Sequence, residues 1–94
     1  MEQAVRNGAC LRVGATNDPR RRSLEYDREG YARCVMFFCR AANARMTENH
    51  LLHVARTRGT GRHNVQGSSN YANCPGFVYL IMAPPRPRPF FGIF

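Results

Sequence analysis

The hydrophobic positions of this chain gather in three short apolar runs that are separated by two segments with helical spacing. The first run, residues 10–14, predicts a strand, and Gly14 permits a tight exit from it. The second run lies within residues 31–40, and its unbroken apolar stretch 34–39 is typical of a strand covered on both faces. The third run, Gly76–Met82, predicts a further strand in the centre of the sheet.

The first helical segment begins at Asp18 and Pro19. The Asp18 side chain can cap free N–H groups, and Pro19 has a fixed φ and no N–H group of its own. We expect this helix to extend from residue 18 to about residue 29, with Gly30 as a left-handed cap. Cations in its first turn oppose the helix dipole, so a bound polyanion would relieve that conflict, whereas a solvated basic turn is the simpler alternative. The three cations concerned are Arg20, Arg21 and Arg22.

The second helical segment is Ala44–Arg58, with Asn43 as its cap and Gly59 as its stop. Its apolar residues form one stripe, and Glu48 falls on that stripe. A carboxylate that faces a core is costly unless it is paired or bound to a metal ion. The alternative is a glutamate at the edge of the stripe that reaches water or pairs with an arginine.

The remaining stretches carry weaker patterns. Residues 1–9 predict a lead-in or an extension of the first strand, and residues 59–75 predict a long loop, a length that often marks a functional segment. Residues 83–94 are rich in proline and arginine and should be an extended tail beyond a domain of residues 1–82. The order of elements predicts an α/β fold with a small three-stranded, mainly antiparallel sheet flanked by helices.

Composition narrows the range of functions. The net charge is +8, and all fourteen basic residues are arginines, whose guanidinium groups match phosphate oxygens in paired hydrogen bonds. The charge therefore favours a polyanionic partner, most often nucleic acid. No apolar run is long enough to span a membrane, and the polar N-terminus is unlike a signal peptide. The four cysteines show no CxxC pair, so we expect free thiols in an intracellular protein, nuclear or cytoplasmic and not secreted.

Several stretches together resemble a known family. RVGATNDPRRRSLEY (residues 12–26) resembles the second half of the GIY-YIG nuclease signature, and GFVYLI (residues 76–81) resembles the first half. The apolar strand and the helix with TENHLL are similar to the third strand and the glutamate helix of that family. The first-motif strand comes last here, so the resemblance implies a circular permutant joined through residues 59–75.

The resemblance implies roles for individual residues. Tyr79 matches the tyrosine that acts as a general base or positions the attacking water, and Arg22 matches the arginine that contacts the scissile phosphate. Tyr26 matches a position held by histidine or tyrosine in relatives. Glu48 matches the glutamate that holds a single divalent metal ion, Mg²⁺ or Mn²⁺. Asn64 matches a polar residue that recurs near the site.

One position departs from the family pattern, because Arg12 aligns with the second-motif tyrosine. A guanidinium can stabilise phosphate charge, but it cannot replace a phenol in proton transfer at neutral pH. Tyr31 and Tyr71 are the candidates to supply a phenol instead. For Tyr79 to act as a base, its pKa must fall from a reference value of about 10, and we expect cationic neighbours to lower it.

The sequence therefore predicts a metal-dependent endonuclease that hydrolyses phosphodiester bonds, with DNA as the favoured substrate. Glu48, Arg22 and Tyr79 should converge on one cleft, while the nucleic-acid-binding set is Arg12, Arg20, Arg21 and Asn64. Two alternatives stay open. The first, supported by Arg12, is a catalytically inactive nucleic-acid-binding module. The second is a protein-interaction module that recruits a partner through the tail. A homodimer formed by exchange of the last strand is also compatible with the long loop.

Overall fold

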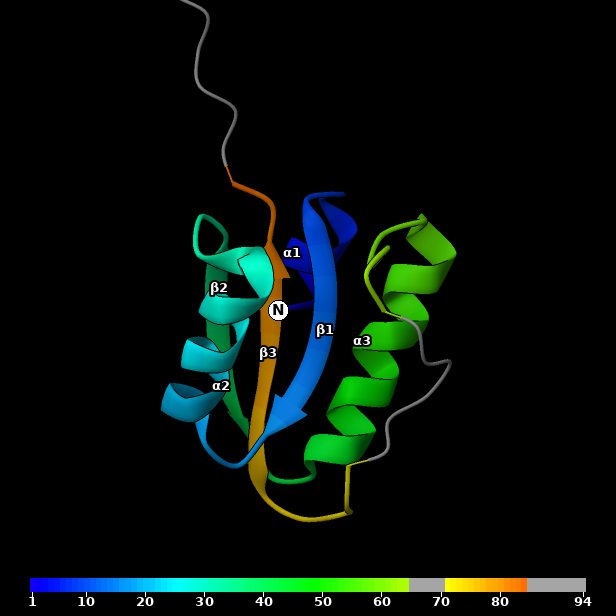
Figure 1. The fold of residues 1–94 in the computed structure, drawn as a ribbon. Helices are drawn as coiled ribbons and strands as arrows, with labels where there is room; N and C mark the ends of the chain where they lie inside the picture. The colour runs from blue at the N-terminus through cyan, green and yellow to red at the C-terminus, as the bar shows by residue number, and fades with distance from the viewer. Residues whose placement is uncertain (65–70, 85–94) are drawn as a thin grey trace, which may run out of the picture.

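The computed structural model describes residues 1–64 and 71–84, which form one α/β domain (Figure 1). In chain order the elements are α1 (Glu2–Arg6), β1 (Cys10–Thr16), α2 (Pro19–Tyr26), the π-helical turn η1 (Asp27–Tyr31), β2 (Val35–Ala41), α3 (Ala44–Arg58) and β3 (Gly76–Met82). The expected loop is thus described only in part. Of the expected tail, only residues 83 and 84 are described.

The three strands form one antiparallel sheet in the order β1-β3-β2. The last strand of the described residues, β3, is therefore central, as predicted, and it pairs with β1 from the opposite end of the sequence. In this register Gly14 lies opposite Tyr79, and on the other side Phe38 also lies opposite Tyr79. Within residues 1–64 and 71–84, β1 is an edge strand, and no other strand pairs with its outer edge.

Helices cover both faces of the sheet (Figure 1). On one face, α1 and α3 pack against β1 and β3. The buried residues of this layer are Val5, Cys10, Val13, Ala15, Ala44, Leu51, Leu52, Val54, Ala55, Val78 and Leu80. On the other face, Tyr26 of α2 packs with Tyr79 and Ile81 of β3. The small α/β fold with a three-stranded antiparallel sheet flanked by helices is therefore confirmed.

The helix boundaries follow the predicted caps. The Asp18 carboxylate accepts a hydrogen bond from the Arg21 N–H at 3.0 Å, and the Asn43 side chain accepts one from the Met46 N–H at 3.1 Å. Gly59 ends α3 with φ of 68°, a left-handed value at which glycine is unstrained. The α3 bounds are those predicted, as is its buried apolar stripe with Glu48 upon it.

The end of the first helix differs from the expectation. Regular α-helix stops at Tyr26, and the chain continues as the turn η1 up to Tyr31, with Gly30 inside that turn at φ of 103°. The positive φ at Gly30 was anticipated, but it lies within a widened turn rather than at the cap of a longer α-helix. The second strand consequently begins at Val35, and Tyr31 is not part of it.

Three other regions differ from what the sequence indicated. Residues 1–9 contain the helix α1, which has only five residues and is too short to show a helical period; its Val5 is completely buried against the core. β2 is covered on one face only, because it is an edge strand beyond the reach of most of α3, and Phe37 is 50% exposed. Gly14 does not mark an exit from β1, which continues to Thr16. Among the described residues, no helix is long and apolar enough to cross a membrane.

Candidate active site at the outer edge of the first strand

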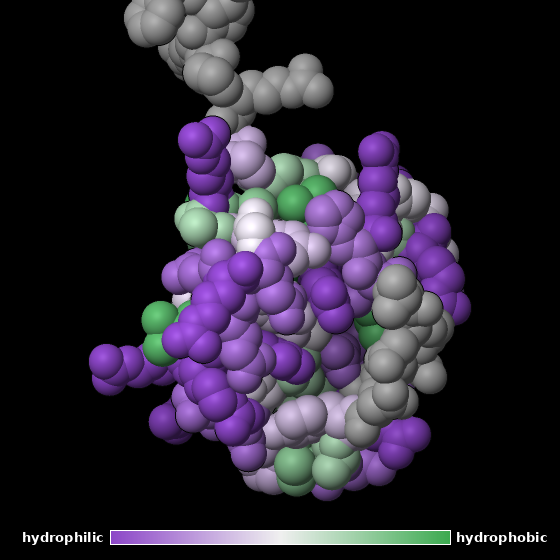
Figure 2. Space-filling model, in the orientation of Figure 1, coloured by the Kyte–Doolittle hydropathy of each residue, from purple (hydrophilic) through white to green (hydrophobic). Residues whose placement is uncertain are grey.

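A pocket of about 290 Å³ lies along β1, between α2 and α3. It is lined by Arg12, Val13, Gly14, Ala15, Arg22, Glu48, Leu52, Asn64, Tyr71 and Tyr79. The expected convergence of Glu48, Arg22 and Tyr79 on one cleft is therefore found. These residues come from both faces of the sheet, and they meet because β1 is an edge strand around which the two layers approach each other. Hydrophilic residues dominate this face of the molecule (Figure 2).

On the α2 side, the pocket is built on a pair of buried tyrosines. The hydroxyl oxygens of Tyr26 and Tyr79 are hydrogen-bonded at 2.8 Å, and both side chains are buried. Two guanidinium groups contact the Tyr26 ring, with the Cζ atoms of Arg12 and Arg22 at 5.3 Å and 5.5 Å from the ring centroid. An aromatic ring attracts a cation through its quadrupole, so Tyr26 holds both arginines beside the pocket.

Gly14 determines where Tyr79 lies. A Cβ atom built on Gly14 would be 2.2 Å from both Cζ and the hydroxyl oxygen of Tyr79. The phenol therefore occupies the space that any other residue at position 14 would fill. This requirement explains Gly14 better than a turn does, and it was missed because the cross-strand partner of Gly14 is 65 positions away in the sequence, at residue 79.

The ionisation of Tyr79 is opposite to the expectation. Burial raises the pKa of Tyr79 above its ordinary value, and the hydrogen bond with Tyr26 raises it further. Arg22 and Arg12 lower this pKa, as predicted, but their effect is smaller than that of burial. The phenol is therefore neutral at physiological pH, where it can donate a hydrogen bond or orient a water molecule, but it is a poor general base.

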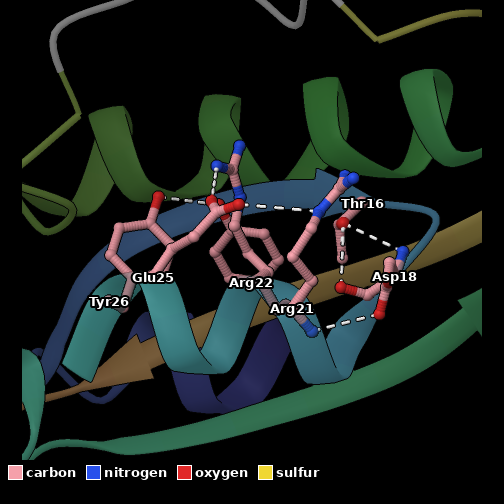
Figure 3. Close-up of polar contacts among 7 residues, drawn as sticks. Thr16, Asp18, Arg21, Arg22, Glu25 and Tyr26 are labelled. Carbon is pink, nitrogen blue, oxygen red and sulfur yellow. Dashed lines mark hydrogen bonds and ion pairs between the residues drawn. The ribbon is translucent and has the colours of Figure 1, made fainter. Parts of the chain in front are cut away.

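Arg22 is held from the outer side by Glu25. One terminal nitrogen of Arg22, Nη1, lies 2.7 Å from Glu25 Oε2, and Nε of Arg21 lies 3.5 Å from Glu25 Oε1 (Figure 3). Burial is the largest single effect and lowers the pKa of Arg22, but the hydrogen bond to Glu25 and the neighbouring Tyr79 and Tyr26 together outweigh it, so the pKa is raised and the guanidinium stays charged. Its Nε–H is buried without a hydrogen-bond partner among the described residues.

Glu48 brings a carboxylate from α3 to the opposite wall, where its side chain is 8% exposed. Among residues 1–64 and 71–84 there is no group of three or more His, Cys, Asp or Glu side chains that could hold a metal ion. Mg²⁺ is commonly bound by one or two carboxylates, with water and substrate phosphate oxygens as the other ligands. The residues therefore fit a hard divalent ion that binds together with a phosphate, and they do not form a preformed metal cage.

Asn64 has a positioning role in this structure. Its amide pairs with both backbone groups of Val13, accepting from the Val13 N–H at 2.9 Å and donating to the Val13 carbonyl at 2.8 Å. Two neighbouring backbone bonds, from Gly61 N–H to Cys10 O and from His63 N–H to Leu11 O, continue this contact. The segment after α3 is thus fixed along the outer edge of β1. The Asn64 amide is already engaged there, which favours positioning over the direct nucleic-acid contact that was expected.

The other predicted residues separate into two groups. Arg12 lines the pocket, whereas Arg20 and Arg21 are exposed at the start of α2 and do not line it. Of the two alternative tyrosines, Tyr71 lines the pocket, while Tyr31 is hydrogen-bonded to His63 outside it. Glu25 was not anticipated, although its spacing of three residues from Arg22 is a helical ion-pair spacing that the sequence contains.

Comparisons with known proteins identify no relative of this chain. No family model matches the chain, and neither a curated protein nor a solved structure matches it. The protein is therefore described by its own fold and site, which are a small α/β domain and a pocket beside β1 with two arginines, a buried tyrosine pair and one carboxylate.

Proposed function

We propose that this protein binds nucleic acid at the pocket beside β1 and hydrolyses a phosphodiester bond there, in DNA, with one divalent metal ion held by Glu48. The observation that carries the proposal is the convergence of Arg12, Arg22, Glu48 and Tyr79 on one pocket. The resemblance to GIY-YIG nucleases supports the same assignment, because it selects three of these four residues from the sequence alone.

The chemistry follows from the two walls of the pocket. On one wall, Arg12 and Arg22 bind the phosphate and stabilise the negative charge that develops on it during attack by water. On the other wall, Glu48 would hold Mg²⁺ or Mn²⁺, which when bound polarises the phosphate and stabilises the leaving oxygen. Tyr79 remains neutral and hydrogen-bonded to Tyr26, so its role is to orient the phosphate or the attacking water.

A second candidate function is a nucleic-acid-binding module without catalysis. Two observations favour it: the raised pKa of Tyr79 keeps the phenol protonated, so little of the phenolate needed by a general base is present at neutral pH, and Glu48 is the one carboxylate among the residues lining the pocket. Such a module would keep Arg12 and Arg22 as phosphate ligands, and it would bind without cleaving. Binding and cleavage must therefore be measured separately.

Cleavage is tested with end-labelled single-stranded, duplex and branched DNA and with RNA, each in Mg²⁺, Mn²⁺ or EDTA. We expect cleavage with metal that EDTA abolishes. Glu48→Gln should abolish it while folding and binding are kept, because the shape of the side chain is retained and only its charge is lost. Glu29→Gln removes the same charge from an exposed position outside the pocket and is the matched control. Cleavage by Glu48→Gln at the wild-type rate would show that this carboxylate is structural.

Binding is tested through its dependence on salt. Each phosphate that the protein neutralises releases counterions, so the affinity should fall steeply as salt rises. Arg22→Ala should weaken binding and reduce the slope of log K against log salt by about 1. Arg28→Ala, at an exposed position in η1, is the matched control and should change both quantities less. Binding without cleavage on every substrate would favour the second candidate.

A further inference from the structure

Two aromatic residues that the proposed chemistry does not use lie next to the pocket. The Tyr31 hydroxyl and His63 Nδ1 share a hydrogen bond of 2.7 Å, and their ring centroids are 5.6 Å apart. Tyr31 also packs edge-on against Tyr26, with centroids 5.3 Å apart and an interplanar angle of 89°. Tyr26 is the ring that carries Arg12 and Arg22, so the aromatic pair is in direct contact with the phosphate-binding wall.

The position of this pair along β1 is fixed by the backbone. His63 donates its N–H to the Leu11 carbonyl, whereas the pocket is centred on residues 12–15 of the same strand. Gly14 lies three residue steps along the strand from Leu11, a distance of roughly 10 Å. Arg12 lies between them. A nucleotide adjacent to the one whose phosphate enters the pocket would therefore come within reach of the aromatic pair.

The rings present surface that a planar group could cover. His63 is exposed and Tyr31 is half-buried. The Tyr31 and His63 rings meet edge-on, with an interplanar angle of 60°. The Tyr31 and Tyr26 rings also meet edge-on. Edge contacts of this kind do not cover a whole ring face. The hydrogen bond between the two side chains holds the histidine ring in one orientation, which lowers the entropy cost of stacking a partner upon it.

We propose that Tyr31 and His63 form a seat for one unpaired nucleobase next to the bound phosphate, so that the substrate class is single-stranded nucleic acid or a duplex with a flap, bulge or flipped base. This inference rests on the proposed function, since it requires a phosphate in the pocket. A base inside a regular duplex has both faces stacked on its neighbours, so only an unpaired base can offer a face to a side chain. The cationic surroundings favour a nucleotide over an apolar peptide side chain.

The test compares two strands that carry the same number of phosphates. One is a thymidine homopolymer and the other is an abasic strand of equal length, measured at the same salt concentration. Stacking of one base on an aromatic side chain should make the wild-type protein bind the thymidine strand about five-fold or more tightly than the abasic strand. His63→Ala should bring this ratio close to one and leave the salt slope unchanged, because no phosphate ligand has been removed.

Control measurements distinguish base stacking on Tyr31 and His63 from binding elsewhere on the protein. Phe37→Ala removes an aromatic ring that is 50% exposed on β2, away from the pocket, and should leave the ratio at the wild-type value. For a fully paired duplex, His63→Ala should not change the affinity. A wild-type ratio of one, or a ratio that His63→Ala leaves intact, would overturn the seat but not phosphate binding. No binding to either strand at low salt would overturn the proposed function and the seat together.

Discussion

Gly14→Ala is the substitution whose effect follows most directly from the structure. The new Cβ atom would lie 2.2 Å from Tyr79 Cζ, a distance at which one of the two groups must move. Tyr79 is 2% exposed and packs with Tyr26 and Ile81 in the layer beneath α2, so a shift of its ring disturbs that packing. A displaced phenol also loses its 2.8 Å hydrogen bond with Tyr26.

The magnitude combines three effects. Over-packing of a core costs about 1–3 kcal/mol, and loss of a buried hydrogen bond costs about 1 kcal/mol. Replacing glycine in a strand recovers about 0.5–1 kcal/mol, because glycine loses more backbone entropy on folding. We therefore expect a net loss of about 2 kcal/mol in the free energy of unfolding. For a domain of this size, that loss corresponds to a fall in Tm of roughly 8–16 °C.

The assay is thermal and urea unfolding followed by circular dichroism, together with nucleic-acid binding. Gly76→Ala is the matched control, since it introduces the same methyl group into a strand but with its nearest contact at 3.2 Å. Its effect should be clearly smaller. A Tm for Gly14→Ala equal to that of the wild type or of Gly76→Ala would refute the conclusion that Gly14 makes room for Tyr79.

Three further outcomes are expected. Tyr79→Phe and Tyr26→Phe should each lower the free energy of unfolding by about 1–2 kcal/mol, because each leaves a buried hydroxyl without its partner. The double substitution should cost little more than either single one, and urea unfolding in which the two losses simply add would contradict this. The raised pKa of Tyr79 means that only the unfolded chain releases this proton near pH 10, so stability should fall as pH rises past that value, and less steeply in Tyr79→Phe. Hydrogen bonds from His50 and Arg6 lower the pKa of Glu2 in the folded protein. The stability that the Glu2 carboxylate contributes is therefore present above its unfolded pKa and is lost as pH falls through its lower folded pKa. Glu2→Gln should make the free energy of unfolding depend less on pH in the acid range.

The sequence by itself determined the elements whose signals are local. The Asn43 and Gly59 caps defined α3 because capping involves side-chain and backbone groups within one or two turns. The apolar run Gly76–Met82 predicted a central strand, since a strand buried on both faces has no polar alternation. The position of Glu48 on the apolar stripe of α3 likewise indicated a buried carboxylate, which is costly unless it is paired or bound to a metal ion.

The tertiary structure alone decided what depends on contacts between distant residues. Phe37 is exposed because β2 lies at the edge of the sheet, and an apolar residue has the same sequence signal whether its strand is at the edge or in the centre. Gly14 is required by a ring from β3, and the pKa of Tyr79 is raised because burial outweighs two nearby arginines. Burial and cross-strand packing are properties of the assembled layers. For that reason, the sequence and the family resemblance could select Arg22, Glu48 and Tyr79 as site residues, but the raised pKa of Tyr79 and the contacts of Arg22 with Glu25 and Tyr26 follow only from the folded structure.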